Sequence, residues 1–321
     1  MFCHYLRLLC VYLQMKWRKY TFSETSIGEL IIKRKGELMD ILIALLPALL
    51  WGSVVLINVK VGGSPYEQIM GTVIGAFIIG SITYVIVQPE LNTKILLVGM
   101  ISGAFWALGQ GNQLKSVDLI GVSKTMPIST GLQLVGTTLI SVIFFNEWKT
   151  TTSIVLGVAA LTLLIIGVML TSLKGKEDDQ AKGNLKKALP ILLISTLGYV
   201  TYVVIGQFFG VEGWSALFPQ SIGMVLGGLM LALKHHPKKK AVAKNMLPGV
   251  LWALGNMAMF YSQPKVGVAT SFSFSQMLVV VSTLGGIFLL GEKKTKKQYI
   301  GISAGIVLII IAAFLLGYAK Q

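Results

Sequence analysis

The sequence predicts an all-α membrane protein in which ten transmembrane helices form two inverted five-helix repeats. Hydrophobic residues fill 54% of the 321 positions and charged residues only 13%, whereas a soluble domain carries about 25% charge. A large share of any soluble globule's surface stays in water, so a chain this apolar needs lipid around it. The apolar residues also fall into long blocks, and motifs in the first half of the chain recur in the second.

Apolar runs of about 20 residues are long enough to cross a bilayer as helices. Short charged or Pro/Gly-containing links separate these runs, and the longest link, 174–186, divides the chain into halves 39–173 and 187–321. The predicted spans lie near 41–59, 67–87, 94–114, 120–145, 152–173, 187–209, 214–233, 246–263, 266–290 and 298–318.

Residues 1–38 differ from the rest of the chain. They are basic and aromatic, and their apolar run is too short and interrupted to span a bilayer. The codons of Lys35-Gly36-Glu37 can spell a purine-rich bacterial ribosome-binding sequence just before the codon of Met39. We therefore predict that residues 1–38 are translated leader DNA and that the natural start is Met39. The alternative is an amphipathic helix on the membrane surface.

The two halves resemble each other at several places. FWALGQ at 105–110 matches LWALGN at 251–256, and QIMGTVIG at 68–75 matches QSIGMVLG at 220–227. Sequence similarity that recurs at a fixed spacing along the chain indicates an internal duplication. Because five spans are an odd number, the second half enters the membrane upside down, an arrangement characteristic of secondary transporters. The alternative is a duplication that merely enlarges the bundle.

Lysines set the expected orientation. They concentrate in the links after odd-numbered spans, including 174–186. The positive-inside rule therefore makes that linker cytoplasmic and places both natural termini outside a bacterial plasma membrane. A net charge of +15 would suggest nucleic acid in a soluble protein, but no such motif occurs and the lysines separate apolar blocks. The cysteines Cys3 and Cys10 support no disulfide framework or metal site, and no cofactor is expected.

Polar and aromatic stripes on the spans could hold a small polar solute that carries hydroxyl groups, such as a sugar. Amides pair with hydroxyls, and aromatic rings cover the apolar face of a pyranose. Spacings of four and seven place such residues on one helix face. In membrane helices the same residues often only bond a neighbouring helix, at roughly 0.6 kcal/mol each, or anchor span ends. The predicted substrate-binding residues are Trp51, Asn58, Trp106, Gln110, Gln113, Thr130, Gln133, Tyr202, Trp252, Asn256 and Gln276.

Few charged residues could couple transport to an ion gradient. Lys124 lies three residues before Pro127, and we expect this proline to break the helix and free backbone carbonyls. Lys124 could instead extend to the interface. The repeat-equivalent acids Glu147 and Glu292 could carry a proton or form salt bridges with neighbouring lysines. The coupling candidates are Lys124, Glu67, Glu147 and Glu292.

Several of these stretches resemble a known family. PALLWGS at 47–53, WALGQGNQL at 106–114, SKTMPISTGLQLVGT at 123–137 and the span ends NEWKT and GEKKT are similar to the glucose/ribose uptake porters of the drug/metabolite transporter superfamily. The resemblance covers 39–321. It implies a ten-helix fold, inward carbohydrate transport and proton coupling.

We therefore predict a secondary transporter that imports a monosaccharide, glucose or ribose-like, by proton symport with alternating access. The alternatives are a sugar uniporter and a drug or metabolite exporter of the same superfamily; an exporter of organic cations should show a buried carboxylate, and none is apparent. No nucleophile-base pair or metal motif suggests an enzyme, and a membrane scaffold would not need the polar stripes. The expected partners are the sugar, protons and the lipid bilayer, with no nucleic acid, and we expect a monomer.

Overall fold

The computed structural model describes residues 24–145, 148–171, 179–211 and 213–319, without the side chains of 24–37, 179–183 and 268–269. Every regular element in these residues is an α-helix. The chain divides into two units, 1–42 and 43–321. The second unit holds all the predicted spans except the beginning of the first one. Much of the predicted leader lies outside the described residues, and its origin stays a prediction.

The helices follow the predicted spans closely. The first half contains α2 (Glu24–Val61), α3 (Pro65–Val87), α4 (Thr93–Ile120), α5 (Val122–Phe145) and α6 (Thr151–Thr171). The second half contains α7 (Asp179–Phe209), α8 (Trp214–Ala232), α9 (Lys239–Lys244), α10 (Met246–Val266), α11 (Val268–Ser275), α12 (Leu278–Phe288) and α13 (Lys296–Ala319). The short α9 lies in a link, and α11 with α12 occupies the predicted ninth span.

Nine helices in the described part of the chain are long and apolar enough to cross a membrane, judged by length and composition alone. The predicted eighth span forms the 21-residue helix α10 but is not among them. Its polar residues Asn256, Ser262 and Gln263, followed by Lys265, lower the hydropathy of the helix. The prediction of an all-helical, multi-span membrane protein is confirmed.

The connections between helices show why the chain turns where it does. Ser64 caps α3 by accepting a hydrogen bond from the Glu67 N–H (3.4 Å), and the Glu67 carboxylate accepts one from the Ser64 N–H (2.8 Å). Gly121 joins α4 to α5 with φ of 79°, and Gly267 joins α10 to α11 with φ of 87°. Side chains are strained at such angles, so both halves use glycine for the same turn.

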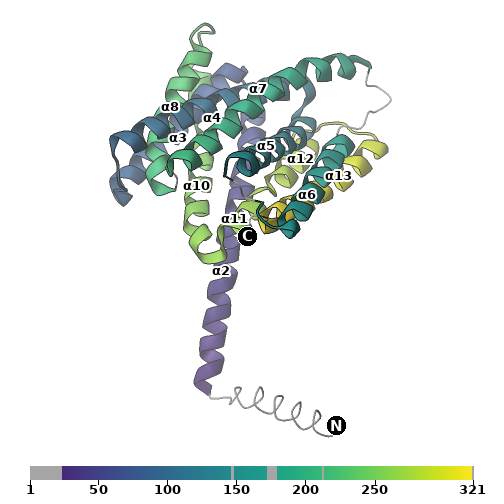
Figure 1. Cartoon of the computed structure of the whole chain (residues 1–321). Helices are drawn as coiled ribbons and strands as arrows, with labels where there is room; N and C mark the ends of the chain where they lie inside the picture. Colours follow the sequence, from purple (N-terminus) through teal and green to yellow (C-terminus); the bar gives the residue numbers. More distant parts are fainter. Residues whose placement is uncertain (1–23, 146–147, 172–178, 212, 320–321) are drawn as a thin grey trace. The chain divides into compact units, whose positions relative to one another are not determined.

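Close helix contacts also recur in the two halves. In residues 43–321, α4 packs against α7 and α8, α10 against α3, and α6 against α13 (Figure 1). A Cβ on Gly103 of α4 would lie 1.9 Å from the Gln220 carbonyl oxygen of α8. A Cβ on Gly249 of α10 would lie 1.8 Å from the Thr72 carbonyl oxygen of α3. Both glycines precede the matching tryptophans by three residues, which agrees with a duplication; the inverted orientation stays a prediction.

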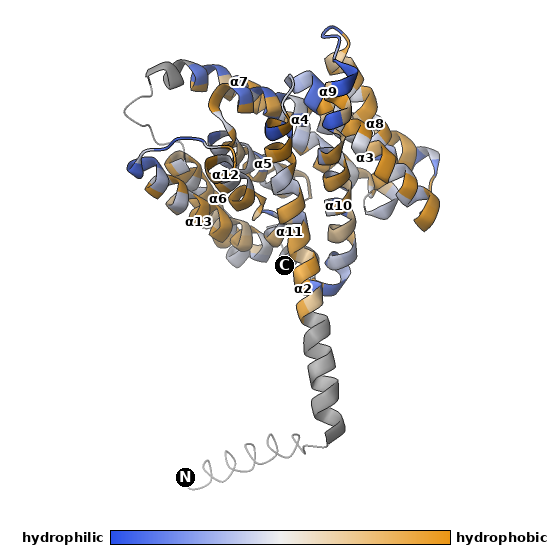
Figure 2. Ribbon diagram, turned by 180° about the vertical axis from the view of Figure 1, so that it is seen from behind, coloured by the Kyte–Doolittle hydropathy of each residue, from blue (hydrophilic) through white to orange (hydrophobic). Residues whose placement is uncertain are grey.

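The outward-facing surface of the bundle is apolar. Large hydrophobic side chains such as Ile86 (75% exposed) and Met230 (74%) point away from the core, and the hydropathy colouring shows apolar residues along the spans (Figure 2). A soluble monomer rarely exposes large contiguous apolar patches. The chain is therefore a multi-pass protein of the cell membrane, with lipid as the solvent for these side chains.

The predicted break at Pro127 is absent. Helix α5 runs without interruption from Val122 to Phe145 and contains Pro127 at its sixth residue. A proline removes one intrahelical hydrogen bond, and α5 continues through it because the neighbouring bonds form, including the one from the Thr125 N–H to the Gly121 carbonyl (3.1 Å). The break occurs in the other half, where Gln276 and Met277 form a turn between α11 and α12.

Candidate substrate cavity

A cavity of about 570 Å³ lies among α2, α4, α5, α7, α8 and α10 to α12. Its size falls within the range of small-molecule sites. All the predicted binding residues except Asn58 line it: Trp51, Trp106, Gln110, Gln113, Thr130, Gln133, Tyr202, Trp252, Asn256 and Gln276. Residues from both halves of the chain therefore share one cavity.

Asn58 lies in a buried contact between α2 and α3. Its side-chain oxygen accepts a hydrogen bond from the Thr72 hydroxyl (3.4 Å), and its backbone carbonyl accepts one from the Gln68 amide (3.2 Å). Asn58 is two turns beyond Trp51 on the same helix face, and the cavity ends before it. Its position suits a helix-helix contact, the alternative that the sequence left open.

Aromatic side chains form one wall of the cavity. The Trp106 and Trp252 rings lie 5.1 Å apart between centroids at an interplanar angle of 56°. Trp106 also makes an edge contact with Tyr199 at 6.3 Å, and the Trp51 indole N–H donates to the Trp252 carbonyl (3.0 Å). These contacts bring the repeat-equivalent tryptophans together from opposite halves and hold them in fixed orientations.

A network of amides and hydroxyls forms a second wall. The Tyr199 hydroxyl donates to the side-chain oxygens of Gln110 (2.5 Å) and Gln113 (3.2 Å). The side-chain amides of Gln113 and Gln133 both donate to the Ser129 hydroxyl, at 2.7 and 2.9 Å. The Gln110 amide nitrogen is buried and has no hydrogen-bond partner among the described residues. A buried donor of this kind calls for a partner, and a solute hydroxyl in the cavity would supply one.

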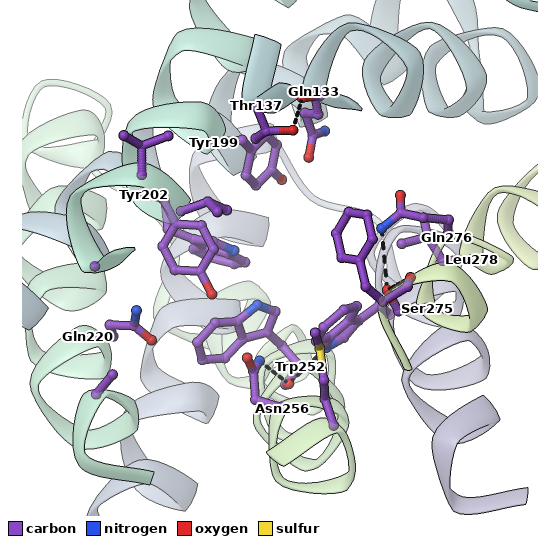
Figure 3. A pocket seen from close by; sticks show the side chains of 18 of the residues that line it. Gln133, Thr137, Tyr199, Tyr202, Gln220, Trp252, Asn256, Ser275, Gln276 and Leu278 are labelled. Atoms are coloured by element: carbon purple, nitrogen blue, oxygen red, sulfur yellow. Dashed lines mark hydrogen bonds between the residues drawn. The ribbon is translucent and has the colours of Figure 1, made fainter. Parts of the chain in front are cut away.

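Further polar groups surround the open centre of the cavity (Figure 3). The Asn256 amide donates to the Trp252 carbonyl (2.8 Å) and the Gln276 amide to the Ser275 hydroxyl (3.3 Å). The Gln220 amide donates to the Ser102 hydroxyl (3.1 Å). Sequence reasoning missed Gln220 as a lining residue. Its place at the start of QSIGMVLG, an amide within an apolar span, was the signal that could have identified it.

The cavity extends toward one end of the bundle. At that end it reaches Val211 and Gly213, in the connection between α7 and α8. At the other end its lining stops at Gln113 and Met126, near the turn that joins α4 to α5. We call the first end the α7–α8 end and the second the α4–α5 end.

No acidic or basic side chain is among the described residues that line the cavity. Glu67 bonds its own helix cap and the Lys238 N–H (3.0 Å), and Lys124 lies on α5 outside the lining. Glu292 forms the salt bridge that the sequence allowed as an alternative, with Lys294 at 3.3 Å. Glu147 lies outside the described residues. The described coupling candidates are therefore separate from the cavity, and their roles stay untested.

A multi-span helical bundle around a neutral cavity of amides and tryptophans has the architecture of a membrane transporter for a small polar solute. The comparison with protein families is more specific. The model of the family described as sugar transport protein matches residues 42–319, and the chain belongs to that family. This confirms the sequence-based family prediction at the level of sugar transport.

Curated relatives are similar over nearly their whole length. The glucose uptake protein GlcU of Staphylococcus xylosus is 66% identical over 85% of this chain and 96% of its own. The glucose uptake protein GlcU of Bacillus subtilis (strain 168) is 61% identical over 88% of this chain and 99% of its own. These relatives are named as uptake proteins, not as enzymes.

A solved structure, titled only as the crystal structure of a protein, shares the fold. Its TM-score is 0.54 at 14% sequence identity, and the match covers 86% of this chain and 99% of that one. At this identity the likeness concerns the fold alone.

Proposed function

We propose that this chain imports glucose or a closely related monosaccharide by alternating access, with the cavity as the substrate site. The observation that carries the proposal is the cavity itself, which is lined by paired tryptophans and by amides that include the unpartnered Gln110 nitrogen. The names of the curated relatives support glucose as the cargo.

The tryptophans and the amides of the cavity would contact different parts of a pyranose. The Trp106 and Trp252 rings offer apolar faces for the C–H groups of the sugar. The amides of Gln110, Gln133 and Asn256 offer donors and acceptors for its hydroxyls. A buried hydroxyl that lost its partner would cost about 1–3 kcal/mol, so this division would favour sugars whose hydroxyls match the amide wall.

The neutral lining favours an uncharged cargo. A phosphate or carboxylate in this cavity would meet no basic side chain among the described lining residues, and an unpaired charge away from water is costly. Sugar phosphates and sugar acids should therefore be excluded. An exporter of organic cations is disfavoured for the same reason, because no carboxylate faces the cavity in the described part of the chain.

The direct test uses purified protein in liposomes and counterflow of labelled glucose. We expect excess unlabelled glucose inside to drive uptake of the label. Unlabelled glucose outside should compete, and glucose 6-phosphate should not. Absence of counterflow with glucose, together with counterflow of another solute class, would overturn the proposed cargo.

Proton symport is the proposed energy source, and the family resemblance supports it. A proton carried across about 100 mV supplies about 2.3 kcal/mol, enough for roughly 50-fold accumulation of a neutral sugar. The described candidates Glu67, Glu292 and Lys124 lie outside the cavity, so coupling would act through helix movement rather than through contact with the sugar. In liposomes, an imposed negative-inside potential should drive accumulation that a protonophore abolishes. Uptake that stops at equal concentrations in both cases identifies a uniporter.

The proposed orientation makes the α7–α8 end extracellular. In the chain with Cys3→Ser and Cys10→Ser, a cysteine in place of Lys186, in the linker that the positive-inside rule places in the cytoplasm, tests it. An impermeant thiol reagent on intact cells should leave Lys186→Cys unmodified. Labelling in intact cells would reverse the orientation.

A further inference from the structure

One carboxylate connects two helices at the α4–α5 end of the cavity. Glu292 follows α12, and its Oε1 accepts hydrogen bonds from the N–H groups of Val122 (2.6 Å) and Ser123 (3.3 Å) at the start of α5. Its Oε2 accepts from the Ser123 N–H (3.2 Å) and the Ser123 hydroxyl. The two partners are separated by about 170 residues in the chain. Glu292 therefore acts across the fold rather than as a cap of its own helix.

The surroundings of Glu292 fit this contact closely. A Cβ on Gly121 would lie 2.9 Å from Oε1, and one on Gly286 would lie 3.2 Å from it. Both side chains of the Glu292–Lys294 pair are largely buried. Hydrogen bonds to an ionised acceptor are roughly twice as strong as neutral ones, and the positive end of the α5 dipole adds to the attraction.

The contact lies directly beyond the end of the cavity. Met126 lines the cavity and is less than one helical turn from Ser123, whose N–H and hydroxyl bind Glu292. The cavity extends instead toward the α7–α8 end, where it reaches Val211 and Gly213. Glu292 therefore connects the chain after α12 to the start of α5 at the end that the cavity does not reach.

We propose that Glu292 is a positioning residue of the transport step. Its carboxylate holds the α4–α5 end closed by binding the start of α5, and release of that contact precedes solute exit there. The inference rests on alternating access in the proposed function. It assigns to Glu292 a mechanical role that does not require contact with the sugar, in agreement with its position outside the lining of the cavity.

The test compares thiol labelling at the two ends of the cavity. In the full-length chain with Cys3→Ser and Cys10→Ser, no other cysteine is present. One reporter is Thr125→Cys, fully buried beside the contact, and the other is Met259→Cys, which lines the cavity. Each is combined with Glu292→Gln, which keeps the side-chain size and removes the charge.

We expect Glu292→Gln to speed maleimide labelling at Thr125→Cys about tenfold and to slow it at Met259→Cys, as the population shifts toward opening at the α4–α5 end. Glu292→Asp, which keeps the charge on a shorter side chain, should fall between wild type and Glu292→Gln. The matched control is Glu90→Gln, an exposed acid in the α3–α4 link whose carboxylate bonds only the nearby Asn92 amide among the described contacts; it should leave both rates unchanged.

Opposite changes at the two reporters separate this role from simple destabilisation. A loosened fold would speed labelling at both sites, and that result, like unchanged rates at both, overturns the proposal. The assay contains no sugar, so it reports on Glu292 even if the counterflow experiment rejects glucose as the cargo. In the same variants, Glu292→Gln should reduce the maximal rate of net uptake more than it changes sugar binding at equilibrium.

Discussion

Helix α5 and the α11–α12 pair occupy equivalent places in the two halves, yet they differ in continuity. Helix α5 contains a proline and remains continuous, whereas the α11–α12 pair breaks at Gln276 and Met277 without proline or glycine. One hydroxyl in α11 competes for a backbone carbonyl of the same helix: Ser275 donates to the Phe272 carbonyl (2.7 Å), which also accepts from the Gln276 N–H (3.3 Å). Such bonds offer the backbone alternatives to helical ones.

Matching positions in the two halves share the helix framework but differ in the detail of the cavity. Gly103 and Gly249 make matching close contacts in the two halves. The repeat-equivalent amides differ, because the Gln110 nitrogen is unpartnered among the described residues and the Asn256 nitrogen bonds the Trp252 carbonyl. The helix framework is therefore expected to respond to substitution symmetrically, and the cavity asymmetrically.

The largest expected effect tests whether the helix framework responds symmetrically to substitution in the two halves. Gly103→Val and Gly249→Val each place atoms within 2 Å of a backbone carbonyl oxygen, and overpacking of this kind costs about 1–3 kcal/mol or more. Both variants should lose most of the folded protein, measured by fluorescence-detected size-exclusion chromatography.

The matched controls for the glycine variants lie on the same helices. Ile101→Val on α4 and Leu254→Val on α10 change exposed apolar side chains, with exposed fractions of 46% and 38%. They should behave as wild type. A folded Gly249→Val alongside an unfolded Gly103→Val would show that the two contacts are not equivalent.

The cavity amides should differ in their effect on sugar affinity. Gln110→Leu removes the unpartnered donor and should weaken binding by about 1–3 kcal/mol, or roughly five- to 150-fold. Asn256→Leu should cost less, because the Asn256 nitrogen already has a protein partner. Equilibrium binding of labelled glucose to purified protein measures both. Equal losses would contradict the asymmetry, and wild-type affinity in both would place the site elsewhere.

The break between α11 and α12 should matter more for the rate of transport than for sugar affinity. Ser275→Ala removes a hydroxyl that competes for the Phe272 carbonyl, so the helix should become more regular and the maximal uptake rate should fall a few-fold. Pro127→Ala in the continuous α5 is the comparison variant and should change the rate less. Single-turnover and steady-state uptake measurements compare the two variants. A larger effect of Pro127→Ala would identify α5 as the moving element.

The smallest expected effect concerns the residues that precede the first half. We predict that a chain that starts at Met39 folds and transports as the full-length chain does, because no predicted span or cavity residue lies before it. Expression level, thermal stability and glucose uptake of the two chains provide the comparison. A Met39 chain that fails to insert would assign residues 1–38 to the functional protein.

The sequence by itself determined the helices and most of the cavity. Runs of about 20 apolar residues predict spans, and spacings of four and seven place Trp106, Gln110 and Gln113 on one face. All three line the cavity. These features depend on local periodicity, which a single sequence displays directly.

Only the tertiary structure decided which polar faces meet. Asn58 and Gln220 look alike in sequence, yet Asn58 lies against α3 and Gln220 lines the cavity. The continuity of α5 through Pro127 and the contact between Glu292 and the start of α5 were likewise decided by packing. The physical reason is that periodicity fixes which residues share a helix face, whereas the rotation of each helix depends on close contacts with partners far away in the chain.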